Sequence, residues 1–157
     1  MSIDNLAQLK ALSLFGMVTA LAEIQAEAPR LTLTPDGYLH RLIDAEIAYR
    51  QARSLRYQLS AAKFPIHRDL VGFMWQESPL AQAQIQQLAS AAFMEEAHNL
   101  ILVGGTGTGK THLATAIGVA AIHQGKRVRF YNAVDLVNEL EREKQAGKTG
   151  RMARKLN

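Results

Sequence analysis

Gly104-Gly105-Thr106-Gly107-Thr108-Gly109-Lys110-Thr111 is the stretch that decides the expected fold. It fits the spacing G-x-x-x-x-G-K-[ST] of the phosphate-binding P-loop. The apolar run 99–103 enters it and predicts a buried strand, and the alanine-rich segment 112–123 leaves it and predicts a helix. The sequence therefore predicts a strand, a phosphate-binding loop and a helix in direct succession.

Each position of this stretch has a physical role. The backbone N–H groups around 105–109 are expected to form a nest for phosphate oxygens, which requires backbone angles and a close approach that glycine allows. Lys110 would place an ammonium on the β- and γ-phosphates, Thr111 would offer its hydroxyl to Mg²⁺, and the helix start adds partial positive charge. The predicted nucleoside-triphosphate site is Gly104, Gly105, Thr106, Gly107, Thr108, Gly109, Lys110 and Thr111, with Thr111 as the Mg²⁺ ligand.

Other interpretations of the glycines are less consistent with the sequence. A dinucleotide-binding loop needs G-x-G-x-x-G, but the third glycine position is occupied by Lys110 in one register and by His112 in the other. A plain glycine-rich turn would not explain the fixed positions and both flanks together. A small-molecule P-loop kinase fits the motif alone, but no acceptor-binding or lid region is apparent.

Composition limits the class of protein. The chain has 157 residues, 48% of them hydrophobic and 20% charged, which suits one ordinary core and a small second module. It has no cysteine, so a disulfide framework and a thiolate metal site are excluded, and its five histidines show no ligand spacing. The start lacks a basic signal-like region, and the most apolar stretch, 113–122, is too short to cross a bilayer. We expect a cytoplasmic protein with no membrane partner.

Basic residues gather in two parts of the chain. Lys and Arg number 18 against 14 Asp and Glu, a formal charge of +4, and the excess lies in residues 41–68 and 142–157. Such patches are typical of nucleic-acid-binding proteins, although two helices with solvent-exposed charged faces would give the same distribution of charge along the sequence. The candidate DNA-contacting residues are Arg50, Arg53, Arg56, Lys63 and Arg68.

The pattern of the N-terminal part is helical. Apolar spacing in residues 3–28 predicts two short helices with a break at Gly16. Thr34-Pro35-Asp36 supplies an N-cap, a first-turn proline and a first-turn acid for a helix that should reach about Lys63. Because Phe64-Pro65 ends that helix, we place a helical module at 1–68, for binding DNA or a partner, and a second domain at 69–157.

The second domain is expected to be α/β. Ser78-Pro79 should cap a helix before the P-loop strand. Gly125 is a plausible C′ residue of the P-loop helix, and the alternating segment 127–131 predicts a second strand. Asn132 can cap a last helix, and the basic segment 147–157 has no clear periodicity, so we expect it to be poorly ordered. The predicted fold class is α/β: an incomplete β-α-β portion of a P-loop NTPase, preceded by a small all-α module.

Together these features resemble the IstB-like ATP-binding family, AAA+ helper proteins of insertion-sequence transposition that are similar to DnaC helicase loaders. The resemblance is carried by the helical, arginine-bearing start, the Phe64-Pro65 hinge, the segment 102–114, Gly125-Lys126-Arg127-Val128-Arg129-Phe130 and the helix around Asp135-Leu136-Val137. It implies an AAA+ fold, ATP and Mg²⁺ as cofactors, DNA and a transposase as partners, and ATP-dependent self-association. It also implies that the stretch around Phe73 and Trp75 approaches the nucleotide base, although core packing would explain these aromatic residues as well.

The family's pattern continues into an apolar strand that ends in Asp-Glu, the Walker B element. Residues 112–157 contain no such sequence, nor a sensor or arginine finger. Phosphoryl transfer depends on positioning the attacking water and on neutralising the charge that develops in the transition state, so we expect ATP binding without efficient hydrolysis. We therefore name no catalytic residue. We interpret the chain as cut short before Walker B. Two alternatives stay open: a DnaC-like loader of a replicative helicase, and a DNA-binding or interaction fragment whose nucleotide site is vestigial.

Overall fold

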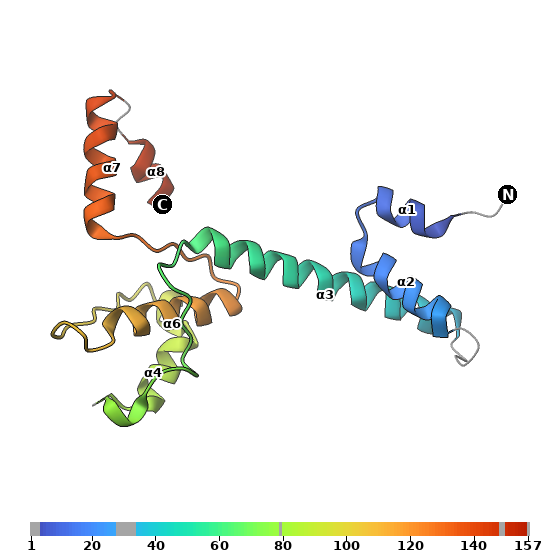
Figure 1. Ribbon diagram of the computed structural model, residues 1–157, viewed down its shortest axis with the longest axis horizontal. Coiled ribbons are helices and arrows are strands. Elements are labelled where there is room, and N and C mark those ends of the chain that lie inside the picture. Colours follow the sequence, from blue (N-terminus) through green and yellow to red (C-terminus); the bar gives the residue numbers. More distant parts are fainter. Residues whose placement is uncertain (1–3, 28–33, 79, 148–149, 157) are drawn as a thin grey trace. The chain divides into compact units, whose positions relative to one another are not determined.

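The computed structural model describes residues 4–27, 34–78, 80–147 and 150–156. The chain divides into two compact units, residues 1–57 and 58–157, and the division falls inside the long helix α3 (Figure 1). The predicted functional division at 68/69 remains a prediction. No helix in the described part of the chain is both long and apolar enough to cross a membrane.

The first unit is built from α1 (Asn5–Ala11), α2 (Phe15–Glu27) and the beginning of α3 (Pro35–Ala62). The α3 start forms as predicted, because the Thr34 hydroxyl accepts a hydrogen bond from Gly37 N at 3.2 Å and Asp36 lies in the first turn. Two helices precede α3, as expected, but the break lies between Ala11 and Phe15.

Gly16 lies inside α2, so its predicted role as a helix break is wrong. It is buried with Ala20 and Ile24, each four residues apart on one face of α2. A Cβ atom at Gly16 would lie 2.4 Å from Ala45 O and 2.6 Å from Glu46 Cα. Glycine is needed here because the backbones of α2 and α3 approach each other closely.

Glu46 on α3 connects the same two helices. This residue is 5% exposed, and its Oε2 accepts hydrogen bonds from Gly16 N at 2.8 Å and Met17 N at 3.3 Å. Arg50 Nε donates to Glu46 Oε1 at 2.7 Å. The Arg50 hydrogen bond holds the pKa of Glu46 below its ordinary value, against the opposing effect of burial and with help from the two backbone N–H groups.

The second unit is organised around α6 (Lys110–His123), which is apolar on all sides and is buried along most of its length. Ile85 of α4 (Gln82–Ala89) is 2% exposed, and α4 packs on α6. On α6, a Cβ atom at Gly118 would lie 3.0 Å from Phe64 Cε1 and 3.4 Å from Val128 Cγ1. The remaining short elements of this unit are η2 (Trp75–Glu77), α5 (Ala92–Glu95), α7 (Ala133–Gln145) and α8 (Arg151–Leu156).

Two of the predicted helix ends are confirmed by their hydrogen bonds. Gly125 has φ 76°, and Gly125 N and Lys126 N donate to the carbonyls of Ile122 and Ala121, which is a Schellman end to α6. At the start of α7, Asn132 Oδ1 accepts from Val134 N at 2.9 Å. At both helix ends, the residue type at a single position was therefore sufficient to predict the boundary.

Two other expectations about helices are wrong. α4 begins at Gln82, after Ala81, and not directly after Ser78, whose hydroxyl accepts from Leu80 N instead; Pro79 lies outside the described residues. The basic C-terminal segment, in which we expected no periodicity and poor order, contains the helix α8; there Met152 is 2% exposed, and Glu143 of α7 accepts a hydrogen bond from Met152 N at 2.9 Å.

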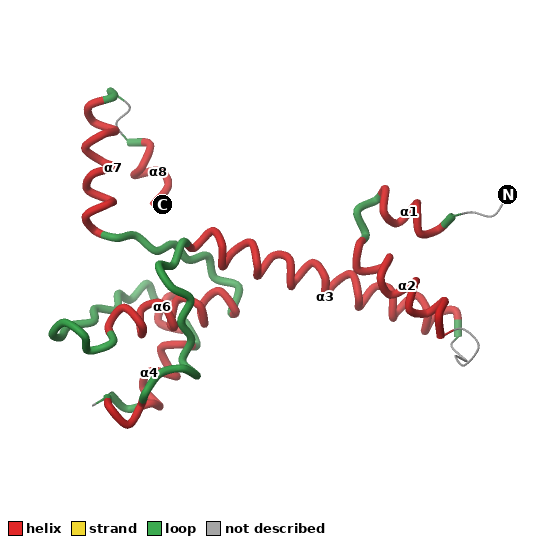
Figure 2. Tube along the Cα trace, in the orientation of Figure 1, coloured by secondary structure: helices red, strands yellow, loops and turns green. Residues whose placement is uncertain are grey.

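The predicted β-α-β portion is not present, so the α/β fold class is wrong for this structure. Figure 2 shows only helices and loops among the described residues, and the segments 99–103 and 127–131 carry no strand. Ile101 is 80% exposed and Val103 is 91% exposed. The physical reason is that an extended segment becomes a strand only by pairing with another; instead, Phe130 N donates to Ala62 O at the end of α3, at 2.8 Å.

The close approach at Gly16 predicts a large cost for a small change. Gly16→Ala should destabilise the first unit by about 1–3 kcal/mol, because backbone atoms of α3 occupy the space of the new methyl group. Thermal unfolding followed by circular dichroism, with amide hydrogen exchange of α2, measures this cost. Gly72→Ala is the control, since its nearest neighbour, Asp69 Oδ1, lies at an ordinary 3.5 Å; equal stability of the two variants would contradict the packing described for α2 on α3.

The lowered pKa of Glu46 predicts an acid-sensitive first unit. The carboxylate is stabilised in the folded state, so its contribution is complete above the unfolded-state pKa of about 4.3 and is lost as the pH falls through the lower folded-state pKa. Glu46→Gln should therefore lower stability at neutral pH and flatten the loss of stability in acid. The exposed Glu23→Gln on α2 is the control and should leave the pH profile of unfolding unchanged.

Candidate functional site

The loop 104–109 has the backbone conformation that its glycines predict. Gly107 has φ 78° and Gly109 has φ 82°, in the left-handed region where another residue costs about 1–2 kcal/mol. The N-cap residue of α6 is Gly109, which has no side chain with which to cap the helix. The first N–H groups of α6 are therefore available to an outside acceptor.

The N–H groups of the loop itself are available as well. Among the described residues, none of the backbone–backbone hydrogen bonds with good geometry has its donor in 105–109, although Thr106 and Gly107 lie in a turn. The residues 104–108 are exposed. Exposed N–H donors in a glycine loop at a helix start suit a phosphate group, so the residues present fit the triphosphate that the motif predicts.

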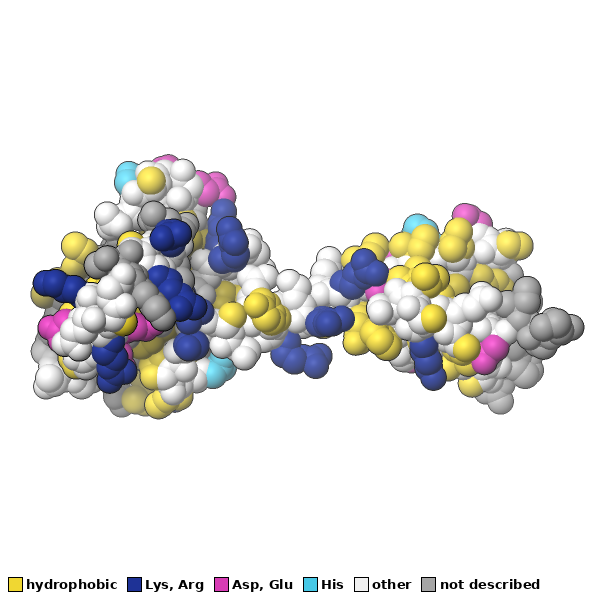
Figure 3. Space-filling view, turned by 90° about the horizontal axis from the view of Figure 1, so that it is seen from above, with side chains coloured by type: hydrophobic (Ala, Val, Ile, Leu, Met, Phe, Trp, Pro, Cys, Tyr) yellow, Lys and Arg dark blue, Asp and Glu magenta, His cyan; other side chains and the backbone are white. Residues whose placement is uncertain are grey.

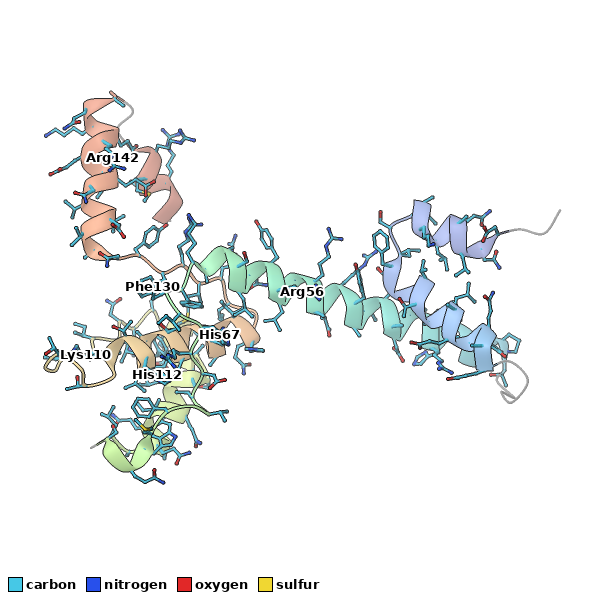
Figure 4. All side chains as sticks on the ribbon, viewed as in Figure 1. Arg56, His67, Lys110, His112, Phe130 and Arg142 are labelled. Carbon is cyan, nitrogen blue, oxygen red and sulfur yellow. The ribbon has the colours of Figure 1, made fainter. Side chains whose placement is uncertain are left out.

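Lys110 lies in the first turn of α6 and its side chain turns back over the loop (Figure 4). Its Nζ donates to Gly105 O and lies 3.4 Å from Thr108 Oγ1, which in turn donates to Gly105 O at 2.9 Å. The ammonium is thus held beside the loop by neutral acceptors. A phosphate oxygen is a stronger, charged acceptor for the same group.

Thr111 follows Lys110 and is exposed. The described residues contain no group of three or more His, Cys, Asp or Glu side chains placed to hold a metal ion. A Mg²⁺ ion at this position would therefore take one ligand from the Thr111 hydroxyl and others from phosphate oxygens and water, as Mg²⁺ sites on nucleotides do.

An aromatic cluster lies beside the last glycine of the loop. A Cβ atom at Gly109 would lie 3.2 Å from Phe73 Cε2, so the Phe73 ring lies against the glycine loop. The ring centroids of Phe73 and Trp75 are 4.7 Å apart, and those of Phe73 and His112 are 5.2 Å apart. The family resemblance pointed to Phe73 and Trp75; His112 was not singled out, and its position next to Thr111 is the one signal for it in the sequence.

The candidate DNA-contacting residues are not equivalent. Arg50 is committed to Glu46, although 64% of its side chain remains exposed. Arg53 and Arg56 are exposed on α3, where Figure 4 shows the Arg56 side chain extending from the helix. Lys63 and Arg68 are also exposed but belong to the second unit, so the set is divided between both units. Figure 3 shows Lys and Arg side chains among hydrophobic ones on the visible face.

Comparison with known proteins covers nearly all of the chain. The family model described as IstB-like ATP binding protein matches residues 7–157. The chain is 38% identical over 112 residues to the insertion sequence IS5376 protein of Geobacillus stearothermophilus, covering 71% of this chain and 45% of that protein. It is 32% identical over 153 residues to the IS21 protein of Pseudomonas aeruginosa, with 97% and 57% covered.

A third relative, the IS1162 protein of Pseudomonas fluorescens, is 31% identical over 158 residues, with 99% of this chain and 68% of that protein covered. The chain thus spans about half the length of the first two relatives. The family match extends from the helical N-terminal part through the glycine loop 104–109 to the last described helix. The chain therefore belongs to the IstB-like ATP-binding protein family.

Proposed function

We propose that this chain binds ATP with Mg²⁺ through residues 104–111, as a helper protein of insertion-sequence transposition. The observation that carries the proposal is the loop itself: a glycine loop with two left-handed glycines, no side-chain cap and a lysine folded across it. The matched family is described as ATP binding, and the relatives are named for insertion sequences. The motif, the loop and the family support the same ligand.

The ligand would bind by replacing contacts that the loop now makes with itself. Lys110 would exchange the Gly105 carbonyl and the Thr108 hydroxyl for β- and γ-phosphate oxygens. The N–H groups of the loop and of the α6 start would donate to the same oxygens, and Thr111 would hold Mg²⁺. None of these steps requires α6 to move, because the helix is fixed by its burial.

DNA and a transposase are the partners we propose, with ATP-dependent self-association along DNA. The module 1–68 would contact DNA, and 69–157 would bind the nucleotide. Arg53 and Arg56 are the better-supported DNA ligands, because they are exposed while Arg50 is paired with Glu46. Their exposure suits contacts with phosphates, which need no fixed geometry.

The alternatives differ in partner and in nucleotide dependence. A DnaC-like loader would retrieve a replicative helicase in a pull-down, whereas a transposition helper would retrieve the transposase of its element. A DNA-binding fragment with a vestigial nucleotide site would bind DNA in a salt-dependent way that neither ATP nor Lys110→Ala changes.

Lys110→Ala is the test of ATP binding. Isothermal titration with Mg²⁺-ATP should give a dissociation constant at least about tenfold higher for the variant, because a charge-assisted phosphate contact is lost. Lys126→Ala is the matched control: this lysine follows the other end of α6 and pairs with Glu95 at 3.1 Å. Equal ATP affinity in wild type and Lys110→Ala, or no ATP binding by the wild type, would refute the proposal.

The double variant Arg53→Ala, Arg56→Ala is the test of DNA binding. Each lost phosphate contact should lower the slope of log affinity against log salt by about one unit and weaken binding to any DNA sequence alike. Arg41→Ala is the control on the same helix, since Arg41 pairs with Glu27 at 3.0 Å. Fluorescence anisotropy with labelled duplex DNA at several salt concentrations measures both; an unchanged salt slope in the double variant would rule out these arginines as ligands.

A further inference from the structure

We propose that His112 is a positioning residue of the nucleotide site: it holds residues 69–75 against the start of α6 and thereby lets the nucleoside half of the ligand contribute to binding. This inference rests on the proposed ATP binding and adds a role for a residue that the motif does not include. The residues involved all belong to the second unit.

The first contact is a hydrogen bond between parts of the chain that are far apart in sequence. His112 Nε2 lies 3.0 Å from Asp69 O. A backbone carbonyl can only accept, so the imidazole must donate, which places a proton on Nε2. Since His112 is in the first turn of the buried helix α6, this bond ties residue 69 to the most rigid element of the unit.

The segment that begins at Asp69 is a closed turn, so a bond that fixes Asp69 also fixes residues 70–73. Asp69 Oδ1 accepts from Gly72 N at 2.9 Å, and Phe73 N donates to Leu70 O at 3.4 Å. Asp69 is thus held at its side chain by the turn and at its carbonyl by His112. The Phe73 ring lies at the end of this turn.

The second contact is between rings. Phe73 and His112 meet edge to face, with ring planes at 85° and centroids 5.2 Å apart, and Phe73 meets Trp75 at 4.7 Å. The Phe73 ring also reaches Gly109 in the loop. His112 therefore touches both ends of the turn, its first carbonyl and its last ring, and holds that ring beside the loop.

Phosphates that bind 104–111 leave the nucleoside of the ligand outside the loop. There, the half-buried Phe73 ring at Gly109, with Trp75 packed against it, offers a surface on which a sugar or base can pack. If the turn 69–73 detached from α6, the groups that donate hydrogen bonds to the phosphates would remain, but the aromatic surface would be lost. His112 should therefore affect nucleoside binding more than phosphate binding.

The experiment compares two ligands on one set of variants. His112→Phe keeps an aromatic ring beside Phe73 but removes the N–H donor, whereas His112→Gln keeps a donor. We expect His112→Phe to raise the dissociation constant of Mg²⁺-ATP about fivefold, the effect of one hydrogen bond, and that of Mg²⁺-tripolyphosphate by less than about twofold. His112→Gln should restore part of the ATP affinity. His123→Phe, an exposed histidine at the other end of α6, is the matched control and should change neither constant.

Trp75 gives a second readout that needs no ligand. It is the one tryptophan of the chain and it packs on Phe73, so its fluorescence reports on the turn directly. The emission of ligand-free His112→Phe should shift to longer wavelength and be quenched more readily by acrylamide, while His123→Phe should match the wild type. If His112→Phe raised the dissociation constants of both ligands equally, or changed neither constant nor the Trp75 emission, the role of His112 would be overturned while the proposed ATP binding would stand. If Lys110→Ala left the ATP affinity unchanged, the proposed function and this inference would be overturned together.

Discussion

The burial of α6 is the constraint on which the second unit depends. The helix carries apolar residues on every side, so it needs neighbours on every side. Ile85 of α4 and Phe64 at Gly118 supply two of them, and the Schellman hydrogen bonds close its far end. Because burial fixes the helix, its first turn is fixed too, although Lys110 and Thr111 remain accessible. If 104–111 bind phosphate as proposed, the rigid helix beneath them lowers the reorganisation that binding requires, compared with a site on a free loop.

Features set by a few neighbouring residues could be predicted from the sequence. The caps at Thr34 and Asn132, the C′ glycine at Gly125 and the left-handed glycines of the loop depend on side-chain chemistry and allowed backbone angles within one turn. The strands could not be predicted in the same way. The pattern of 99–103 shows that the segment can be extended, but a strand exists only if another segment pairs with it, and that depends on distant parts of the chain.

The same distinction explains which residues of the candidate site were found and which were missed. The spacing of 104–111 is local and was sufficient to locate the loop and its lysine. The contact of His112 with Asp69 spans 43 residues, and no local pattern encodes it. Gly16 is a similar case: conformational freedom alone assigned it to a helix break, whereas the close α2–α3 contact explains it. The hydrogen bond of Arg50 to Glu46 was likewise not visible in the sequence, and the assignment of Arg50 to DNA stays a prediction.

The two units are stabilised by different interactions, and this matters for what their surfaces can do. In the first unit the buried Glu46 carboxylate accepts hydrogen bonds from two backbone N–H groups and from Arg50. Arg50 is thus paired although much of its side chain is exposed, whereas Arg53 and Arg56 are exposed on the same helix. Among the described residues of the second unit the core is mostly apolar and no acidic side chain is buried, so its basic residues are not needed to neutralise buried acids. The burial of Glu46 makes its pairing with Arg50 less sensitive to salt than a contact between exposed charges. Raising the ionic strength should therefore weaken DNA binding through exposed arginines before it weakens the fold of the first unit.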